Sequence, residues 1–251
     1  MILDVIKAIA LDIKRSQHIV AFTGAGISAE SGISTYRGEN GLWKKYDPSL
    51  YASIDNFNKN PSYYWNFFKD VRYPTVKKAI PNPGHLALVE LEKSGRSITV
   101  ITQNIDGLHQ EAGSSSVIEL HGTTRIIFCM SCSTEYSMDD VFSRLKNEIP
   151  PLCSECGGHL RPDVVFFGES LNPQTLGRAY READNCDFLL AVGSSLVVYP
   201  AADIPLRVKQ RGGVLAIINK DPTPMDHFAD HLIHDEAGRI LPLIVQSAIS
   251  S

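Results

Sequence analysis

The chain has 251 residues, of which 43% are hydrophobic and 21% are charged. Both fractions are typical of a globular protein. At about 100 to 200 residues per domain, the length predicts one large domain, or a main domain carrying a smaller module. The formal net charge of −4 gives no electrostatic attraction to nucleic acid phosphates. We therefore expect no direct nucleic acid partner.

The N-terminal segment is apolar but does not have the pattern of a membrane anchor. Residues 1–13 are interrupted by Asp4, Lys7 and Asp12, far short of the roughly 18 apolar residues of a membrane span. The same charges argue against a signal peptide. The apolar residues recur at helical spacing, which predicts an amphipathic helix over residues 2–15. We expect a cytoplasmic protein without a membrane partner.

Short runs of Val, Ile and Phe alternate with helical segments, which predicts an α/β fold with a Rossmann-like parallel sheet. Strands are expected over residues 18–23, 97–102, 117–120, 164–167, 188–192, 214–218 and 231–234. Helices are expected over residues 2–15, 84–93, 138–147, 174–184, 201–211 and 238–248. The aromatic-rich region 34–82, without a predicted strand, and the cysteine-containing region 125–162 break this alternation. We interpret them as a helical and a zinc-ribbon insertion into one main domain, formed by residues 1–33, 83–124 and 163–251.

Small or polar residues directly follow six of the predicted strands. They are Gly24, Ala25 and Gly26; Gln103, Asn104, Ile105 and Asp106; His121 and Gly122; Gly168 and Glu169; Gly193, Ser194 and Ser195; and Asn219, Lys220 and Asp221. Ligands of open parallel sheets bind outside the carboxyl ends of the strands. These residues therefore predict an active site at one edge of the sheet.

The loop after the first strand fits a phosphate-binding fingerprint. Residues 24–29 match GxGxxG/A, in which glycines let the backbone approach a pyrophosphate; the alternative is an ordinary tight turn. A dehydrogenase would place an acidic ribose ligand about 20 residues on, but residues 34–39 lead into the aromatic insertion instead. Hydride transfer is therefore disfavoured. Ser195 and Asn219 could meet ribose hydroxyls, and Arg37 could face phosphate or ribose.

Four of the five cysteines form a metal-binding pattern, C-x2-C-x20-C-x2-C, made by Cys129, Cys132, Cys153 and Cys156. This is zinc-ribbon spacing, and four thiolates leave no open position for substrate, so we expect one structural Zn²⁺. Rubredoxin-like iron and disulfides are the alternatives. The remaining Cys186 precedes an apolar strand and is expected to be a buried small hydrophobe.

Among the eight histidines, His121 alone follows a predicted strand at the proposed edge and is followed by glycine. A histidine there could act as a general base near neutral pH, although a hydrogen-bonded structural role is an equal alternative from position alone. The structural role is expected for the others: His18, His85, His109, His159, His227, His231 and His234.

Together these motifs resemble the sirtuins, NAD-dependent protein lysine deacylases, over nearly the whole chain. The matching segments are GAGISAESGISTYRG (24–38), TQNIDGLH (102–109), ELHG (119–122), the four cysteines, PDVVFFGE (162–169), GSSLVVYP (193–200) and IIN (217–219). The resemblance implies acyl transfer from lysine to ADP-ribose, with release of nicotinamide and, for an acetyl group, O-acetyl-ADP-ribose. A mono-ADP-ribosyltransferase, a deacylase for longer or acidic acyl groups, and a noncatalytic zinc-ribbon protein are the alternatives.

The resemblance also implies residue roles. His121 would be the general base, and Asn104 would belong to the catalytic centre. The NAD pocket would be formed by Gly24, Ala25, Gly26, Tyr36, Arg37, Gln103, Asn104, Ile105, Asp106, Gly193, Ser194, Ser195 and Asn219. An acyl-lysine protein or peptide would be held by Val164, Phe166, Gly168, Glu169 and Val197, in part by β-addition.

The resemblance bears on the acyl group as well. Sirtuins that favour acidic acyl chains are similar to one another in a Tyr-x-x-Arg pair, and counting from Trp65 the matching positions here are Phe68 and Val71. Because neither can pair with a carboxylate, this register predicts acetyl before succinyl or malonyl. Tyr64 and Arg72 lie close by, so a shifted register would supply another polar pair.

Overall fold

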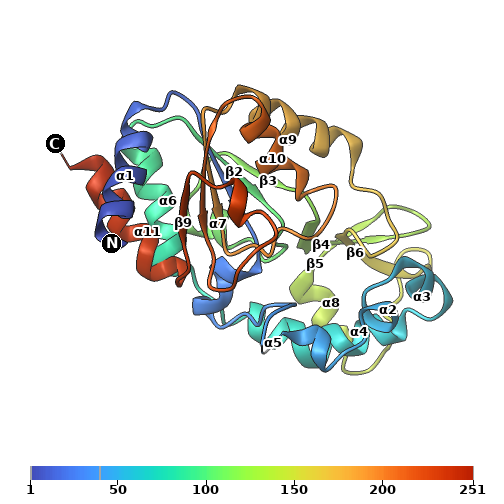
Figure 1. The fold of residues 1–251 in the computed structure, drawn as a ribbon. Coiled ribbons are helices and arrows are strands. Elements are labelled where there is room, and N and C mark those ends of the chain that lie inside the picture. The colour runs from blue at the N-terminus through green and yellow to red at the C-terminus, as the bar shows by residue number, and fades with distance from the viewer. Residues whose placement is uncertain (1, 40, 251) are drawn as a thin grey trace.

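The computed structural model describes residues 2–39 and 41–250, which form a large α/β domain and a smaller second lobe (Figure 1). The large domain is built on a six-stranded sheet in which all neighbouring strands pair in parallel. In spatial order the strands are β3 (Val117–Glu119), β2 (Ile98–Thr102), β1 (Ile19–Thr23), β7 (Phe188–Val192), β8 (Val214–Ile218) and β9 (His231–Ile233). The predicted Rossmann-like parallel sheet is confirmed.

Helices cover both faces of this sheet, which explains why its strands are continuous apolar runs. Along β1, Ile19 and Ala21 belong to one buried cluster and Val20 and Phe22 to the other. The helices of the first face are α1 (Ile2–Arg15), α6 (Pro83–Lys93) and α11 (Ala237–Ile249); those of the second are α9 (Pro173–Asn185) and α10 (Asp203–Gln210). All five match predicted helices to within two residues at each end. Within the described residues, no helix is long and apolar enough to cross a membrane.

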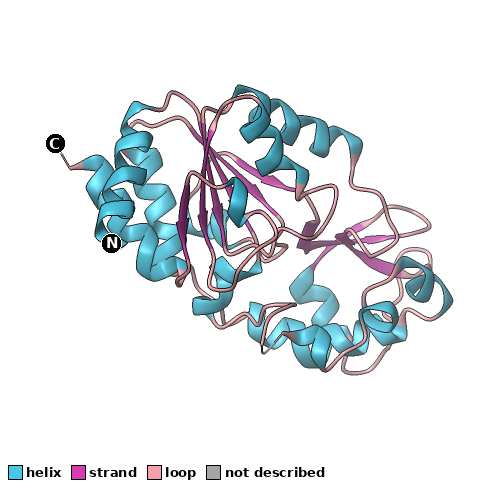
Figure 2. Ribbon diagram, in the orientation of Figure 1, coloured by secondary structure: helices cyan, strands magenta, loops and turns pink. Residues whose placement is uncertain are grey.

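The second lobe combines the two regions that interrupt the alternating pattern, as the labels of Figure 1 show. Figure 2 shows its short helices beside a small sheet. Region 125–162 contributes to an antiparallel sheet, ordered β5 (Glu135–Ser137), β4 (Gly122–Cys129) and β6 (Leu160–Val164), and to helix α8 (Met138–Arg144). The region before α6 contributes α2 (Pro48–Tyr51), α3 (Ile54–Lys59), α4 (Ser62–Phe67), a π-helical turn η3 (Phe68–Arg72) and α5 (Tyr73–Val76). Both regions share one apolar core, and the Trp65 indole donates a hydrogen bond to the Leu160 carbonyl at 3.2 Å.

One predicted strand is wrong. Residues 164–167 do not add to the parallel sheet: β6 ends at Val164, and the chain then turns away while the Val165 N–H donates to the His121 carbonyl at 2.9 Å. The run is apolar because Val164 and Phe166 pack in the core of the second lobe. A run of apolar side chains is expected whether the segment is buried in the parallel sheet or in the core of the second lobe. The sequence pattern therefore does not distinguish these two locations.

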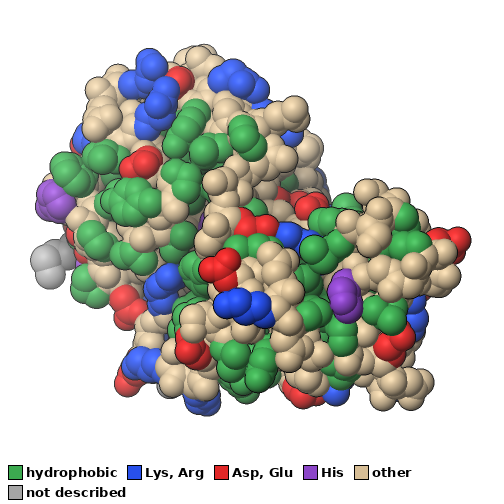
Figure 3. Space-filling view, turned by 90° about the vertical axis from the view of Figure 1, so that its right-hand side faces the viewer, with side chains coloured by type: hydrophobic (Ala, Val, Ile, Leu, Met, Phe, Trp, Pro, Cys, Tyr) green, Lys and Arg blue, Asp and Glu red, His purple; other side chains and the backbone are tan. Residues whose placement is uncertain are grey.

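The surface carries charges of both signs. Figure 3 shows Lys and Arg side chains interspersed with Asp, Glu and apolar side chains over the face that includes the second lobe. This distribution is consistent with the formal net charge of −4.

Candidate active site

A cavity of about 620 Å³ lies between the carboxyl ends of the strands and the second lobe. Loops that follow β1, β2, β3, β7 and β8 form the wall on the sheet side. The segment after β6 and the helical insertion form the opposite wall. The six loops predicted to meet at one site therefore all line this cavity. Five of them follow strands of the parallel sheet, and the loop with Gly168 and Glu169 comes from the second lobe.

Two glycine turns from neighbouring strands touch each other at one end of this cavity. The Gly26 N–H donates to the Gly193 carbonyl at 2.7 Å, and a Cβ on Gly26 would stand 2.6 Å from the Gly193 Cα. Gly193 has a φ of +60°, and a Cβ there would lie 2.2 Å from the Ile27 nitrogen. Both positions require glycine, and Gly24, Ala25, Ser194 and Ser195 also line the cavity. Backbone that lines the cavity without intervening side chains suits a pyrophosphate.

The loop after β2 is held against the glycine turn by its own side chains. Asn104 is 8% exposed, and its amide donates to the Gly24 carbonyl and to the Ser28 hydroxyl, both at 3.1 Å. The Gln103 amide donates to the Ser194 hydroxyl at 2.8 Å. These bonds fix the Asn104 side chain on the cavity wall, next to Ile105.

His121 lies on the same wall, in the turn between β3 and β4. Its Nδ1 lies 2.9 Å from the Gln103 carbonyl oxygen. Since a carbonyl only accepts, Nδ1 carries the proton and Nε2 is left as the basic nitrogen. Burial lowers the pKa of His121, and the backbone hydrogen bond opposes this only in part. The imidazole is therefore neutral near pH 7, as a general base must be.

Two of the predicted site residues do not reach the cavity wall, Asp106 and Val197. The Asp106 carboxylate accepts hydrogen bonds from the Ser28 hydroxyl at 2.8 Å and from the Leu108 N–H at 3.0 Å. These bonds hold the Asp106 carboxylate against Ser28, which in turn accepts from Asn104. Val197 is 42% exposed and lies outside the cavity lining.

The remaining predicted cofactor residues, Tyr36, Arg37 and Asn219, do line the cavity. The Tyr36 ring stacks on Trp43 with centroids 4.9 Å apart. The Asn219 amide donates to the Asp221 carbonyl at 2.6 Å. Arg37 is exposed and makes no ion pair with a described residue, so its guanidinium is available to a phosphate.

The wall opposite the sheet holds four of the five residues predicted to bind substrate, Val164, Phe166, Gly168 and Glu169. Val164 and Phe166 are buried. The Glu169 carboxylate is already engaged: it accepts two hydrogen bonds from Arg161, at 2.9 and 2.7 Å, and one from the Phe166 N–H at 2.9 Å. Its carboxylate holds the loop in place.

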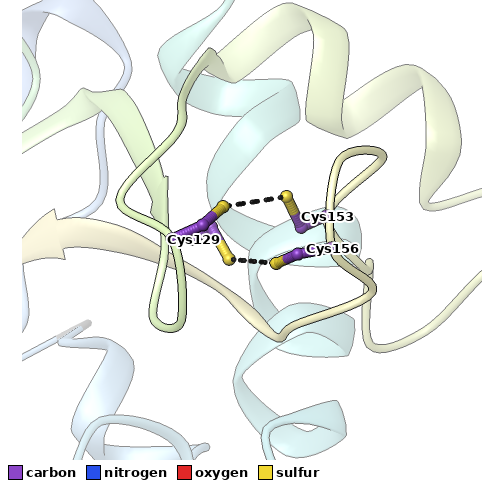
Figure 4. Close-up of side chains that lie close together, drawn as sticks. Cys129, Cys153 and Cys156 are labelled. Carbon is purple, nitrogen blue, oxygen red and sulfur yellow. Dashed lines mark hydrogen bonds between the residues drawn. The ribbon is translucent and has the colours of Figure 1, made fainter.

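The four cysteines of the ribbon pattern converge in the second lobe (Figure 4). All four sulfurs lie within 4.8 Å of one another, with 3.4 Å between Cys129 and Cys156 and 3.6 Å between Cys132 and Cys153. A tetrahedral Zn²⁺ with bonds of about 2.3 Å separates its sulfur ligands by about 3.8 Å. The donors fit one structural zinc, and the fifth cysteine, Cys186, is buried.

Sequence reasoning missed several residues of the site. Ser28 is fully buried and links Asn104 to Asp106; its place inside the glycine fingerprint was the available signal. Tyr64 and Arg72, which the sequence indicated only as the polar pair of a shifted register, both line the cavity from the helical insertion. Behind the site, burial lowers the pKa of His85 to about 4 and that of His109 to about 3, so both are neutral.

The family model described as "Sir2 family" matches residues 24–200. The chain belongs to the Sir2 family. A relative from Caldivirga maquilingensis, named NAD-dependent protein deacetylase, is 50% identical and the match covers 94% of this chain and 91% of that protein. NAD-dependent protein deacylase 2 of Archaeoglobus fulgidus is 46% identical, with 97% and 96% covered.

Solved Sir2 structures share this fold. One, titled for the mechanism and regulation of Sir2 enzymes, has a TM-score of 0.91 at 46% identity and 98% coverage of both chains. A Sir2 complex with a p53 peptide and NAD⁺ has a TM-score of 0.87 at 38% identity, covering 94% of this chain and 95% of that one. The chain is thus an NAD-dependent protein deacylase with NAD as co-substrate, and its four clustered cysteines are consistent with a structural zinc.

Proposed function

We propose that this Sir2 protein removes acetyl groups from protein lysines by transferring them to the ribose of ADP-ribose, with His121 as general base and Asn104 beside it in the reaction centre. One observation supports this assignment above all others: a single cavity joins the glycine turns, His121 and the apolar pair Val164 and Phe166. NAD supplies an electrophilic ribose carbon when its nicotinamide departs. The protein has to orient that carbon against the acyl oxygen and to remove one proton.

Each wall of the cavity has a part in this chemistry. The glycines at positions 26 and 193 make room for the pyrophosphate beside the backbone of Ala25 and Ser195, while Asn104, held by Gly24 and Ser28, reaches the nicotinamide ribose. The neutral Nε2 of His121 would take a ribose hydroxyl proton so that this oxygen bonds to the acyl carbon. The bond from that carbon to the lysine nitrogen then breaks, the lysine leaves as the free amine, and one water molecule supplies the oxygen and protons that complete the acetyl ester of ADP-ribose. The buried aromatic wall limits water, which protects the reacting centre from hydrolysis.

The substrate enters between the two lobes. Supporting this, Phe167 is 42% exposed and its neighbour Phe166 is 4% exposed, so this segment offers both a surface edge and a lined interior. We infer that the peptide backbone adds to the edge at Gly168 and that the acyl-lysine stem passes Val164 and Phe166. A reducing compartment, the cytoplasm, fits a cluster of free thiols that can bind zinc.

His121→Ala tests the assignment. We expect deacetylation of an acetyl-lysine peptide to fall about 10²- to 10⁴-fold, with zinc content and melting temperature unchanged. The matched control is His227→Ala, which removes an exposed histidine outside the cavity and should keep full activity. Activity of His121→Ala within threefold of wild type would show that another group is the base. Transfer of ADP-ribose to protein in place of deacetylation would support the ADP-ribosyltransferase alternative.

A further inference from the structure

One tyrosine of the small antiparallel sheet is directed into the interior of the second lobe. Tyr136 is the middle residue of β5, and it is partly buried while its two neighbours on the strand are exposed. In the antiparallel pairing with β4 it lies opposite Ile127, which is fully buried in the core of this lobe. Residues opposite each other on neighbouring strands share one face of a sheet. The Tyr136 side chain therefore lies on the inner face.

The Tyr136 hydroxyl makes its hydrogen bonds at the second CxxC turn, which carries Cys153 and Cys156. The phenol oxygen lies 3.1 Å from the Cys153 sulfur and 2.9 Å from the Ser154 hydroxyl. It also accepts from the Ser154 N–H at 3.1 Å. A metal-bound cysteine is a thiolate, which can only accept a hydrogen bond. The phenol proton is therefore directed to the Cys153 sulfur, and the Ser154 hydroxyl donates to the phenol oxygen.

This hydrogen bond differs from two others that reach the sulfurs. Cys129 accepts from the Ser131 N–H at 3.3 Å, and the Cys132 sulfur lies 3.2 Å from the Thr134 hydroxyl. Each of these donors stands two residues after the cysteine that it contacts, so it belongs to the same turn. The bond from Tyr136 instead spans 17 residues and joins β5 to the second CxxC turn. It therefore ties the two halves of the metal site together.

An arginine lies against the ring of this tyrosine. The Arg144 guanidinium, on α8, is 4.9 Å from the Tyr136 ring centroid, and its Nη1 donates to the Leu152 carbonyl at 3.0 Å. Its Nη2 is buried without a hydrogen-bond partner, and within the described residues no acid forms an ion pair with it. A cation against an aromatic face draws electron density from the ring, which makes the phenol a stronger hydrogen-bond donor. Because Leu152 precedes Cys153, the guanidinium is anchored beside a metal ligand.

The cysteine cluster needs such donors because it is anionic when zinc is bound. Its four thiolates carry more negative charge than a zinc ion carries positive charge. Figure 4 shows Cys153 and Cys156 on one loop, facing Cys129. Cys129 and Cys153 are buried, whereas Cys132 and Cys156 are exposed. Solvent and competing ligands therefore reach the metal from the side of the exposed pair, and the buried pair holds it from the inside.

We propose that Tyr136, with Arg144 behind its ring, is a positioning residue of the zinc site: its hydroxyl holds the Cys153 thiolate on the metal and slows the release of zinc. The proposal rests on the zinc assignment and is independent of the acyl transfer described above. Hydrogen-bond partners around a metal site typically change metal affinity by about 10- to 100-fold. Loss of the hydroxyl should therefore appear in the rate of zinc release.

Tyr136→Phe tests the proposal, because it removes the hydroxyl and keeps the ring against Arg144. Zinc transfer from the purified full chain to an excess of a chromogenic chelator is followed at constant temperature. We expect zinc to leave Tyr136→Phe about tenfold faster than the wild type, or faster still. The matched control is Tyr73→Phe, which loses a hydroxyl that donates to Asp139 at 2.9 Å in the same lobe. This control should release zinc at the wild-type rate.

A second readout follows the sulfur itself. With Co²⁺ in place of zinc, the sulfur-to-metal charge-transfer band of Tyr136→Phe should move to longer wavelength, because a thiolate without its hydrogen bond gives up an electron more easily. Tyr73→Phe should keep the wild-type spectrum. Arg144→Gln removes the charge but keeps a donor near the Leu152 carbonyl, and it should release zinc faster than the wild type by a smaller factor than Tyr136→Phe.

Wild-type zinc release and an unchanged cobalt spectrum in Tyr136→Phe would overturn the proposal and leave the zinc assignment intact. Equal acceleration in Tyr136→Phe and Tyr73→Phe would also overturn it, since a general loosening of the lobe would then be the cause. If Tyr136→Phe does not fold, Arg144→Gln decides: faster zinc release supports the proposal, and wild-type release refutes it. A wild-type chain that binds no zinc would refute both the proposal and the zinc assignment.

Discussion

The ion pair between Arg161 and Glu169 holds the loop that carries Val164 and Phe166. Arg161 also donates to the Val164 carbonyl at 3.0 Å, and its guanidinium lies 5.1 Å from the Phe166 ring centroid. One guanidinium therefore fixes both ends of the turn beneath the proposed acyl-lysine stem. We predict that Arg161→Met loosens this turn and weakens peptide binding.

The magnitude follows from the burial of the pair. The Arg161 and Glu169 side chains are 15% and 23% exposed. Breaking a fully buried pair costs about 3–5 kcal/mol and an exposed one contributes about 0–1 kcal/mol, so partial burial suggests about 2–3 kcal/mol. At about 2–4 °C per kcal/mol for a chain near this size, the melting temperature should fall by roughly 4–12 °C. If about half of the loss appears in substrate binding, the KM for peptide rises roughly tenfold.

Calorimetry and steady-state kinetics measure both effects. The matched control is Arg178→Met, an exposed arginine on α9, which should change neither quantity. The double variant Arg161→Met/Glu169→Gln should recover part of the stability, because it removes the unpaired carboxylate. A melting temperature within 1 °C of wild type and a KM within twofold for Arg161→Met would refute the reasoning.

Three further predictions address the base, the metal and the glycine turns. Because burial lowers the pKa of His121 and the base acts when neutral, kcat/KM should stay flat from pH 8 to 6.5 and fall only at lower pH; a fall beginning above pH 7 would contradict this. Elemental analysis should find one zinc per chain, and Cys129→Ala should lose zinc, stability and activity together; iron in place of zinc would contradict it. Gly193→Ala should raise the KM for NAD at least tenfold, since its Cβ would meet the Ile27 nitrogen; an unchanged KM would contradict it.

The sequence predicted the sheet and its main helices because their patterns are local. A buried parallel strand reads as an apolar run, and α1 and α9 read as helices because one face of each is apolar. The ribbon pattern placed Cys129 and Cys156 together because four thiolates at that spacing have few other uses. The main sheet, the cysteine cluster and the edge of the sheet where the cavity lies could therefore be found without coordinates.

What could not be predicted depends on contacts between distant segments. The run at residues 164–167 is apolar because it packs on the helical insertion, and the sequence does not say which partner buries it. Asp106 comes shortly after β2, as do the residues of that loop that line the cavity. Its hydrogen bonds to Ser28 and Leu108 hold its carboxylate away from the cavity surface. The position of Arg72 depends on a π turn, which has no sequence signal of its own.

The most direct test of the central claim is a product balance. The purified chain is mixed with NAD and an acetyl-lysine peptide, and mass spectrometry follows nicotinamide, the peptide and the acetyl group. The account predicts equal amounts of nicotinamide, deacetylated peptide and acetyl-ADP-ribose. Free acetate without acetyl-ADP-ribose, or ADP-ribose attached to protein while the peptide stays acetylated, would contradict it.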